Sequence, residues 1–289
     1  MKLVNFQHSY GLRLGIEQGE SVIDVTDVCH ELGFKAPKTL DDLLFDTDSG
    51  LQSLRTLAAE LDPAGPFTRN IAEVQIGPAV TRPGKVLCVG LNYRRHAQEA
   101  NMPIPDEPVL FGCFANAVSA PGADINVAGL EKLDYESELG VVIGRHVSKA
   151  STDEARDAIL GYFNANDLSA RELQLKSGQW LLGKSLDGFL PIGPSIRVAD
   201  EKFDPDNLQI RGWLNGELRQ DSSTSDMIFP VAELVAYTSR YISLEPGDII
   251  ITGTPEGVIM GEKNPNWMKP GDEFTVEIEG LGRLVNRLV

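Results

Sequence analysis

The feature that most constrains the fold is a series of short apolar runs separated by turns and seldom by helices. From residue 83 onward they include residues 86–89, 139–143 and 249–251, each shorter than a typical core helix and well suited to a buried strand. The Asn215-Gly216 step between two further apolar pairs predicts a tight β-hairpin. The second half of the chain is therefore predicted to be built mainly from strands.

Two helices are predicted in this region, one over residues 152–160 with Thr152 as its N-cap and one over residues 231–241. Strands outnumber helices and do not alternate with them regularly. This pattern favours a β-rich α+β fold with a mixed sheet over a doubly wound α/β sheet.

Residues 1–75 are predicted to form a small N-terminal domain, and residues 76–289 a larger domain. The first segment contains two brief strands, near residues 12–16 and 21–25, and a helix over residues 51–61 with apolar residues at helical spacing. Pro63, Gly65 and Pro66 then break the chain. Nothing in this segment carries chemistry, so we expect it to be a structural cap or a dimer element.

The formal net charge of −16 argues against a nucleic-acid partner or an anionic membrane surface, since both would repel the protein. The three cysteines, Cys29, Cys88 and Cys113, are widely separated, and no spacing indicates a disulfide framework or a zinc site. No apolar stretch resembles a signal peptide or a membrane span, so we expect a cytoplasmic protein.

Three carboxylates could form a metal site. Glu136 and Glu138 lead into an apolar strand, and because side chains alternate along a strand they point the same way. Asp167 ends another uncharged run. The three together could hold a hard cation such as magnesium, which prefers oxygen ligands. The alternatives are a solvated strand face for the two glutamates and a helix N-cap for Asp167.

Four other residues could take part in catalysis or in binding. His96 and Glu99 are three residues apart, so on a helical turn the carboxylate could orient the imidazole as a general base; a surface His-Glu pair is the alternative. The proline-containing stretch 100–108 that follows could order as a loop over a site. Lys184 could stabilise negative charge on an oxygen, or be a solvated lysine in a turn. Thr254 follows a strand in a small-residue turn that an anion could approach.

These segments together resemble the fumarylacetoacetate hydrolase superfamily from about Gly84 to the C-terminus. The resemblance rests on six segments in order: VGLNYRRHAQE, DYESELGVVIG, NDLSARELQ, GKSLDGFLPIGP, LNGELRQDSSTSDMIF and PGDIIITGTPEGV. It implies a mixed β-sheet fold around an acidic metal site, usually in a homodimer.

The resemblance also implies a role for each candidate residue. Glu136, Glu138 and Asp167 would hold Mg²⁺ or Mn²⁺, and His96 with Glu99 would activate water on a mobile lid. Lys184 would stabilise an enolate or oxyanion. Arg171, Gln174 and Thr254 would contact the substrate.

Two departures from the family pattern concern the ends of the site. Eukaryotic fumarylacetoacetate hydrolases add an aspartate ligand before the dyad, where this chain has Cys88-Val89-Gly90. Many relatives carry a lysine in the strand after the lid, where this chain has residues 110–113, Leu-Phe-Gly-Cys. The stretch from Gln174 to Lys184 is most similar to members that act on sugar-derived 2,4-diketo acids.

The expected activity is hydrolysis of a carbon-carbon bond in a small anionic 2-oxo acid, a 2,4-diketo acid of the acylpyruvate type. In this scheme water attacks the distal carbonyl and a pyruvate enolate leaves. The same enolate chemistry would serve an oxaloacetate decarboxylase or a 2-hydroxyhepta-2,4-diene-1,7-dioate isomerase, which need no attacking water. A non-catalytic binding protein of the same fold is a further alternative.

Overall fold

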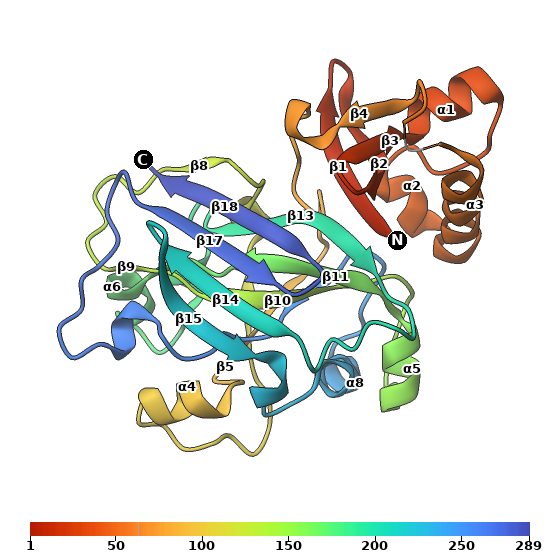
Figure 1. Ribbon diagram of the computed structural model, residues 1–289. Coiled ribbons are helices and arrows are strands. Elements are labelled where there is room, and N and C mark those ends of the chain that lie inside the picture. Colours follow the sequence, from red (N-terminus) through yellow and green to blue (C-terminus); the bar gives the residue numbers. More distant parts are fainter. Residues whose placement is uncertain (63) are drawn as a thin grey trace.

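The computed structural model describes residues 1–62 and 64–289, so Pro63 of the predicted chain break lies outside the described residues. Within these residues the main sheet has eleven strands in the order β4-β3-β2-β1-β13-β11-β10-β16-β5-β6, with β7 beside β13. Figure 1 shows the N-terminal strands in red and orange leading into this sheet at β13.

The N-terminal strands of the main sheet are β1 (Lys2–His8), β2 (Gly11–Gln18), β3 (Ser21–Asp24) and β4 (Thr68–Asn70). The others are β5 (Val86–Gly90), β6 (Val109–Cys113), β7 (Val118–Ser119), β10 (Ser137–Ile143), β11 (Ile159–Asn166), β13 (Leu190–Val198) and β16 (Ile249–Ile251).

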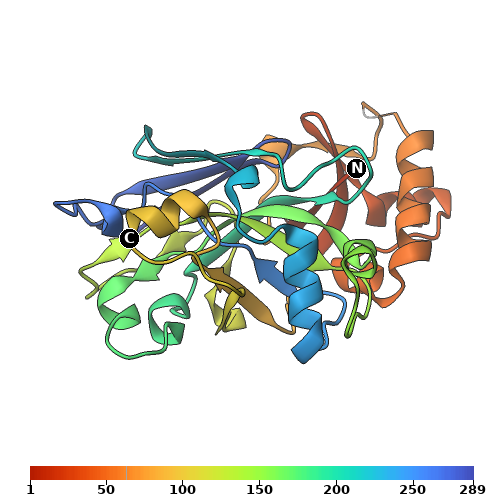
Figure 2. The same cartoon turned by 90° about the horizontal axis from the view of Figure 1, so that it is seen from below.

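A second, antiparallel sheet packs over the middle of the first, and Figure 2 shows its teal and blue strands lying over the green ones. It consists of β15 (Glu217–Ser223), β14 (Gln209–Leu214), β17 (Glu273–Ile278) and β18 (Gly282–Leu288), with β8 (Asp124–Ile125) added in parallel at its edge. The predicted Asn215-Gly216 hairpin joins β14 to β15, and both turn residues have positive φ, as a type I′ turn requires.

Helices lie at the ends and edges of the sheets. They are α1 (Val25–Leu32), α2 (Leu40–Phe45), α3 (Thr47–Glu60), α4 (Arg94–Glu99), α5 (Thr152–Asp157), α6 (Arg171–Gln174), α7 (Leu181–Lys184) and α8 (Val231–Tyr241). Short 3₁₀ turns are η1 (Ile71–Glu73), η2 (Ala115–Ala117), η3 (Thr224–Asp226) and η4 (Ile259–Gly261). The predicted β-rich α+β fold is confirmed. None of these described helices combines the length and the hydropathy that crossing a membrane requires.

One predicted helix begins at the predicted residue, but its N-cap and its C-terminal end differ from the prediction. The helix expected over 152–160 with Thr152 as N-cap ends at Asp157, and Ser151 is its cap, in a capping box with Glu154. Ser151 offers its hydroxyl to the Glu154 backbone N–H, which leaves Thr152 inside the first turn. Ile159 and Leu160 already belong to β11, where they are buried. The helix predicted over 231–241 has the predicted bounds.

Alternate side chains of the central strands supply two hydrophobic cores. Leu139 and Val141 of β10 face the second sheet, whereas Val142 faces the cluster that contains Leu3 and Leu14 of the N-terminal strands. Since β1 pairs with β13, residues 1–75 share both a sheet and a core with the rest of the chain. The domain boundary near residue 75 stays a prediction, and the main sheet continues across it.

Candidate active site

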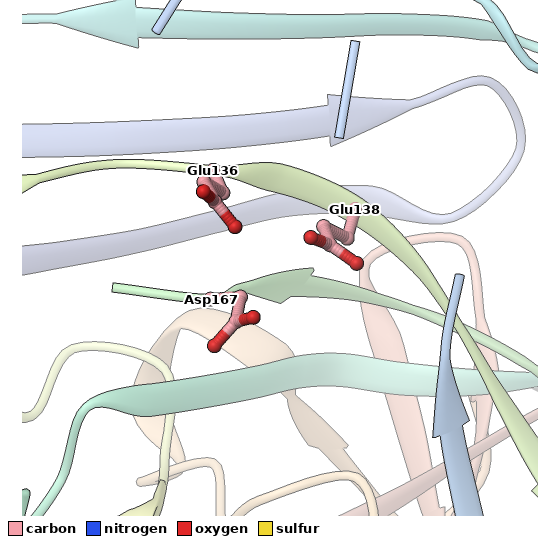
Figure 3. A group of neighbouring side chains, drawn as sticks. All are labelled: Glu136, Glu138 and Asp167. Atoms are coloured by element: carbon pink, nitrogen blue, oxygen red, sulfur yellow. The ribbon is translucent and has the colours of Figure 1, made fainter. Parts of the chain in front are cut away.

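The three predicted metal ligands lie together because two antiparallel strands bring their ends to one place. Glu138 is in β10, Glu136 directly precedes this strand, and Asp167 directly follows β11. The pairing of Ser137 with Asn166 places the start of β10 beside the end of β11. One oxygen of each carboxylate lies within 4.8 Å of the others, and Figure 3 shows the three side chains converging.

All three carboxylates are buried, which removes the simpler alternatives. The solvated strand face is wrong for Glu136 and Glu138, since both side chains point into the protein. The N-cap alternative is wrong for Asp167, because α6 begins at Arg171 with Ala170 as its N-cap. Carboxylates are seldom buried unless a cation or a set of hydrogen bonds compensates their charge.

Two buried cations reach the same carboxylates. The Lys184 Nζ donates to Glu136 Oε2 at 2.5 Å and to Asp167 Oδ2 at 2.9 Å. The Arg171 Nη2 lies 2.7 Å from Glu136 Oε1. Lys184 is 1% exposed, so the alternative of a solvated lysine in a turn is wrong. Both cations are placed where they can bind a substrate anion beside the carboxylate cluster.

The predicted dyad is present on α4. His96 Nδ1 lies 3.1 Å from Glu99 Oε2, and Glu99 Oε1 accepts a hydrogen bond from the Gly257 backbone N–H at 3.0 Å. A carboxylate at Nδ1 favours the tautomer in which Nδ1 carries the proton, so Nε2 is left to accept one. His96 is buried, which disagrees with the alternative of a surface pair.

A cavity of about 280 Å³ joins these groups. Its polar lining residues are His96, Glu136, Glu138, Arg171, Gln174, Lys184 and Thr254. Its apolar lining residues include Phe111, Trp180 and Met260, with Ala100 and Met102 from the predicted loop 100–108. A small ligand that carries both a polar and an apolar group would suit such a lining.

The two remaining substrate-binding candidates have partners inside the protein. Gln174 Oε1 accepts from Arg171 Nη1 at 2.8 Å, which leaves the amide nitrogen for a ligand. The Thr254 hydroxyl donates to the Ser137 carbonyl at 3.0 Å and accepts from Gln220 Nε2 at 2.9 Å. Thr254 therefore also joins β10 to the second sheet.

The pKa values of the carboxylates follow from burial and from these cations. Burial, with Asp167 and Glu136 nearby, raises the pKa of Glu138 well above its usual range. Burial also raises the pKa of Asp167, to about 6, against the opposing charge of Lys184. For Glu136, burial is outweighed by Lys184 and Arg171, which lower its pKa to about 2. Glu138 and Asp167 are thus the carboxylates that a further cation would relieve.

The residues present fit a divalent cation. In the described part of the chain, four buried carboxylates (Asp134 and the three candidate ligands) face only the two buried cations Arg171 and Lys184. Asp167 Oδ1 is buried and has no hydrogen-bond partner among the described residues. Carboxylate oxygens are the preferred ligands of Mg²⁺ and Mn²⁺. When all four carboxylates are ionised, a divalent cation would balance the two negative charges that Arg171 and Lys184 leave. It would also give Asp167 Oδ1 a partner.

Metal affinity is expected to rise with pH through about pH 6, since a cation must displace the protons held by Glu138 and Asp167. Titration calorimetry of Mn²⁺ in buffers of different ionisation enthalpy measures both the affinity and the protons released. We expect at least a tenfold gain between about pH 5 and pH 8, with net proton release. An affinity that does not change over this range would contradict the assignment of these carboxylates as ligands.

Three residues of the site were not given roles from the sequence. Asp134 is fully buried against Arg171, while Trp180 and Phe111 both line the cavity and pack edge to face, 5.2 Å between ring centroids. The one sequence signal for Asp134 is its place in the DYESELG segment, two and four residues before two candidate metal ligands. Trp180 and Phe111 are about 70 residues apart, and no local pattern brings them together.

Comparisons with known proteins agree with this geometry. Residues 85–289 match the family model described as "Fumarylacetoacetate (FAA) hydrolase C-terminal". The chain is 41% identical to the mitochondrial oxaloacetate tautomerase FAHD2B of Bos taurus, covering 100% of this chain and 92% of the relative.

Two solved structures are similar over nearly their whole length. The 2-hydroxyhepta-2,4-diene-1,7-dioate isomerase of Mycobacterium marinum is 30% identical with a TM-score of 0.75, covering 100% of this chain and 98% of the other. The maleylpyruvate hydrolase of Sphingobium sp. SYK-6 is 27% identical with a TM-score of 0.79, covering 100% and 99%.

Proposed function

Because the chain belongs to the fumarylacetoacetate hydrolase family, we propose that it is a divalent-metal-dependent enzyme that forms or protonates the enolate of a small 2-oxo acid. The observation that carries this proposal is the convergence of Glu136, Glu138 and Asp167 on a cavity that also contains Lys184 and His96. The proteins that it resembles include an oxaloacetate tautomerase, a 2-hydroxyhepta-2,4-diene-1,7-dioate isomerase and a maleylpyruvate hydrolase.

The candidate metal ligands, the two buried cations, Gln174 and the dyad each have a place in this chemistry. Glu136, Glu138 and Asp167 would hold Mg²⁺ or Mn²⁺, which when bound supplies Lewis-acid polarisation of the 2-oxo group. Arg171 and the Gln174 amide bind the substrate carboxylate, since both line the cavity. The Lys184 ammonium stabilises the negative charge that develops on the 2-oxo oxygen. His96, oriented by Glu99, exchanges the proton at its Nε2.

The first candidate reaction is keto-enol tautomerisation of oxaloacetate, favoured by the similarity to oxaloacetate tautomerases over the whole chain. His96 removes a proton from C3, the resulting enolate is held by Lys184 and Arg171, and protonation of its oxygen completes the enol. The reverse sequence returns the ketone. No bond between carbon atoms breaks, and no water is consumed.

The second candidate is hydrolysis of an acylpyruvate, favoured by the dyad and by the apolar residues that line the cavity, which suit an uncharged acyl group. Here His96 takes a proton from water and the hydroxide adds to the C4 carbonyl. The C3–C4 bond then breaks, which yields a carboxylic acid and a pyruvate enolate that is protonated at C3. Both candidates require the same metal site and the same stabilisation of the enolate.

Metal-dependent turnover tests the proposal. Chelator-treated protein is compared with protein restored with Mg²⁺ or Mn²⁺, and with the metal alone. The assays follow ketonisation of enol-oxaloacetate, carbon dioxide release from oxaloacetate, and pyruvate release from acylpyruvates. We expect metal-dependent acceleration of ketonisation or of pyruvate release, and the faster of the two identifies the reaction. Preference for carbon dioxide release would instead indicate a decarboxylase, and no acceleration on any 2-oxo acid would refute the proposed function.

We further propose that the enzyme works as a homodimer, without a nucleic-acid or membrane partner. The cytoplasmic location expected from the sequence stays a prediction, since the mammalian tautomerases in the comparison are mitochondrial. Light scattering of the purified protein measures the oligomeric state, and a monomer mass would contradict the homodimer.

A further inference from the structure

Asp134, the last residue of β9 (Leu133–Asp134), accepts five N–H donors while it is fully buried. Its Oδ2 accepts from Arg171 Nε at 2.9 Å, from Arg171 Nη2 at 2.7 Å and from the Met260 backbone at 3.0 Å. Its Oδ1 accepts from the backbone N–H groups of Ile259 at 2.8 Å and Tyr135 at 3.0 Å. One carboxylate thus joins a substrate-binding arginine to the η4 turn.

The contacts to Arg171 fix the direction of its guanidinium. With Nε and Nη2 held by Asp134, the Nη1 nitrogen points to Gln174, and Nη2 also reaches Glu136. Without Asp134 the guanidinium would retain one carboxylate partner, the candidate metal ligand Glu136. The side chain would then be drawn toward Glu136 and away from the direction in which it meets a substrate carboxylate.

The η4 turn and the residues just before it contact Glu99 of the dyad. The Gly257 N–H donates to Glu99 Oε1 at 3.0 Å, and a Cβ at Gly261 would lie only 2.5 Å from Glu99 Cδ. The Tyr135 hydroxyl, one residue after Asp134, donates to the Gly257 carbonyl at 2.8 Å. Glu99 therefore rests on residues 257–261, and this segment is tied down by Asp134 and Tyr135.

We propose that Asp134 is a positioning residue that sets the orientation of Arg171 and, through residues 257–261, of Glu99. Asp134 is not one of the described residues that line the cavity. It therefore acts through Arg171 and Glu99 and touches no substrate. The inference deepens the proposed function and rests on it for the turnover measurements. A binding measurement with oxalate, a planar analogue of a 2-oxo acid enolate, is independent of turnover.

The test replaces Asp134 by asparagine, which keeps the size but turns one acceptor oxygen into an NH₂ group that faces N–H donors. We expect Asp134→Asn to keep Mn²⁺ binding, weakened about 10-fold at most, because it touches none of the three ligands and reaches Glu136 only through Arg171. Oxalate affinity of the Mn²⁺-loaded protein should fall about 10- to 100-fold, as expected for losing charge-assisted hydrogen bonds. For the substrate, KM should rise through Arg171 and kcat should fall through Glu99.

A matched control and a double variant separate positioning from simple loss of stability. Asp24 is an equally buried carboxylate, held by two arginines and two backbone N–H groups in the N-terminal strands. Asp24→Asn should lower the melting temperature without changing KM, kcat or oxalate affinity below it. The double variant Arg171→Gln/Asp134→Asn should fold, because it contains no buried Arg171 cation that has lost its partner. Compared with Arg171→Gln alone, the added Asp134→Asn change should leave oxalate affinity unaltered but should still lower kcat.

Normal oxalate affinity and normal kinetics in Asp134→Asn would overturn the inference, and so would a weakened oxalate affinity that persists unchanged in the Arg171→Gln background. A loss of Mn²⁺ affinity larger than the loss of oxalate affinity would also overturn it, because Asp134 would then act chiefly on the metal ligands and not on Arg171. If wild type turns over no 2-oxo acid while Asp134→Asn still weakens oxalate binding, the proposed reaction fails and the positioning of Arg171 stands.

Discussion

Replacing Glu138 by glutamine is expected to lower Mn²⁺ affinity by at least about 100-fold and to abolish turnover at ordinary metal concentrations. Loss of a group that only supports a ligand costs 10- to 100-fold in affinity, and loss of a ligand itself costs more. Glu138 is the best ligand to change because its contact within the site is to the Gly253 backbone N–H, and it bonds to neither Lys184 nor Arg171. Titration calorimetry with Mn²⁺ measures the effect.

Stability in chelator provides the control for this variant. The folded protein holds the pKa of Glu138 above its unfolded value, so its contribution to stability is present at low pH and is lost as the pH rises and the group ionises. At pH 8 the Glu138→Gln protein should therefore melt at the same temperature as metal-free wild type or higher. Glu136→Gln should also lose metal but melt lower, since it leaves Lys184 and Arg171 with weaker partners. Wild-type Mn²⁺ affinity in Glu138→Gln would remove this residue from the ligand set.

Replacing His96 by alanine is expected to lower kcat by about 100- to 10,000-fold, the usual contribution of a positioned general base. Mn²⁺ affinity should stay within about threefold of wild type, because His96 contacts Glu99 and none of the three carboxylate ligands within hydrogen-bonding distance. Steady-state kinetics on the best 2-oxo acid substrate, with calorimetry of the same preparation, measures both quantities.

Glu99→Gln is the companion variant for the dyad. It keeps an acceptor for the His96 Nδ1 proton but removes the charge that stabilises the imidazolium, so kcat should fall less than in His96→Ala. A His96→Ala protein that works at the native rate would show that another group transfers the proton. An equal loss of metal and of activity in His96→Ala would mean that the histidine supports the metal site instead.

Much of the fold could be predicted from local pattern. The short apolar runs at 86–89, 139–143 and 249–251 lie in β5, β10 and β16, which are neighbours in one sheet, and Asn215-Gly216 forms the expected hairpin. These signals are local, because side-chain alternation and turn geometry depend on a few adjacent residues. The N-cap of the helix predicted over 152–160 is wrong because that signal, too, is purely local. Ser151 and Thr152 are both good caps, and the choice between them depends on the partner Glu154.

Each local signal of the candidate site is ambiguous by itself, and the resemblance to a family assigns the residues roles in one site. Glu136, Glu138 and Asp167 were each compatible with a solvated or capping role, and only the pairing of β10 with β11 places them together. Their burial excludes those roles. It depends on residues far apart in the sequence that line the same cavity, such as His96, Lys184 and Thr254, and no short segment encodes it.

What could not be predicted is long-range in the same sense. The pairing of β1 with β13 joins residues nearly 200 positions apart and makes the N-terminal segment part of the main sheet. The bonds from Asp134 to Arg171 and to Ile259 likewise cross 37 and 125 positions. No periodicity or turn rule refers to partners at such distances.

The measurement that tests the central claim most directly is exchange of the C3 protons of oxaloacetate and of pyruvate, the product of acylpyruvate hydrolysis, into D₂O, followed by NMR. It detects the enolate of each 2-oxo acid, which is the intermediate of the tautomerisation and the leaving group of the hydrolysis. Diamagnetic Mg²⁺ is used in place of Mn²⁺. With Mg²⁺, wild type should accelerate exchange well above the rate with the metal alone, and chelator should remove this acceleration. Glu138→Gln should show no acceleration even with Mg²⁺ present. Exchange that equals the metal-only rate, or that persists unchanged in chelator, would contradict a metal-dependent enolate site built from Glu136, Glu138 and Asp167.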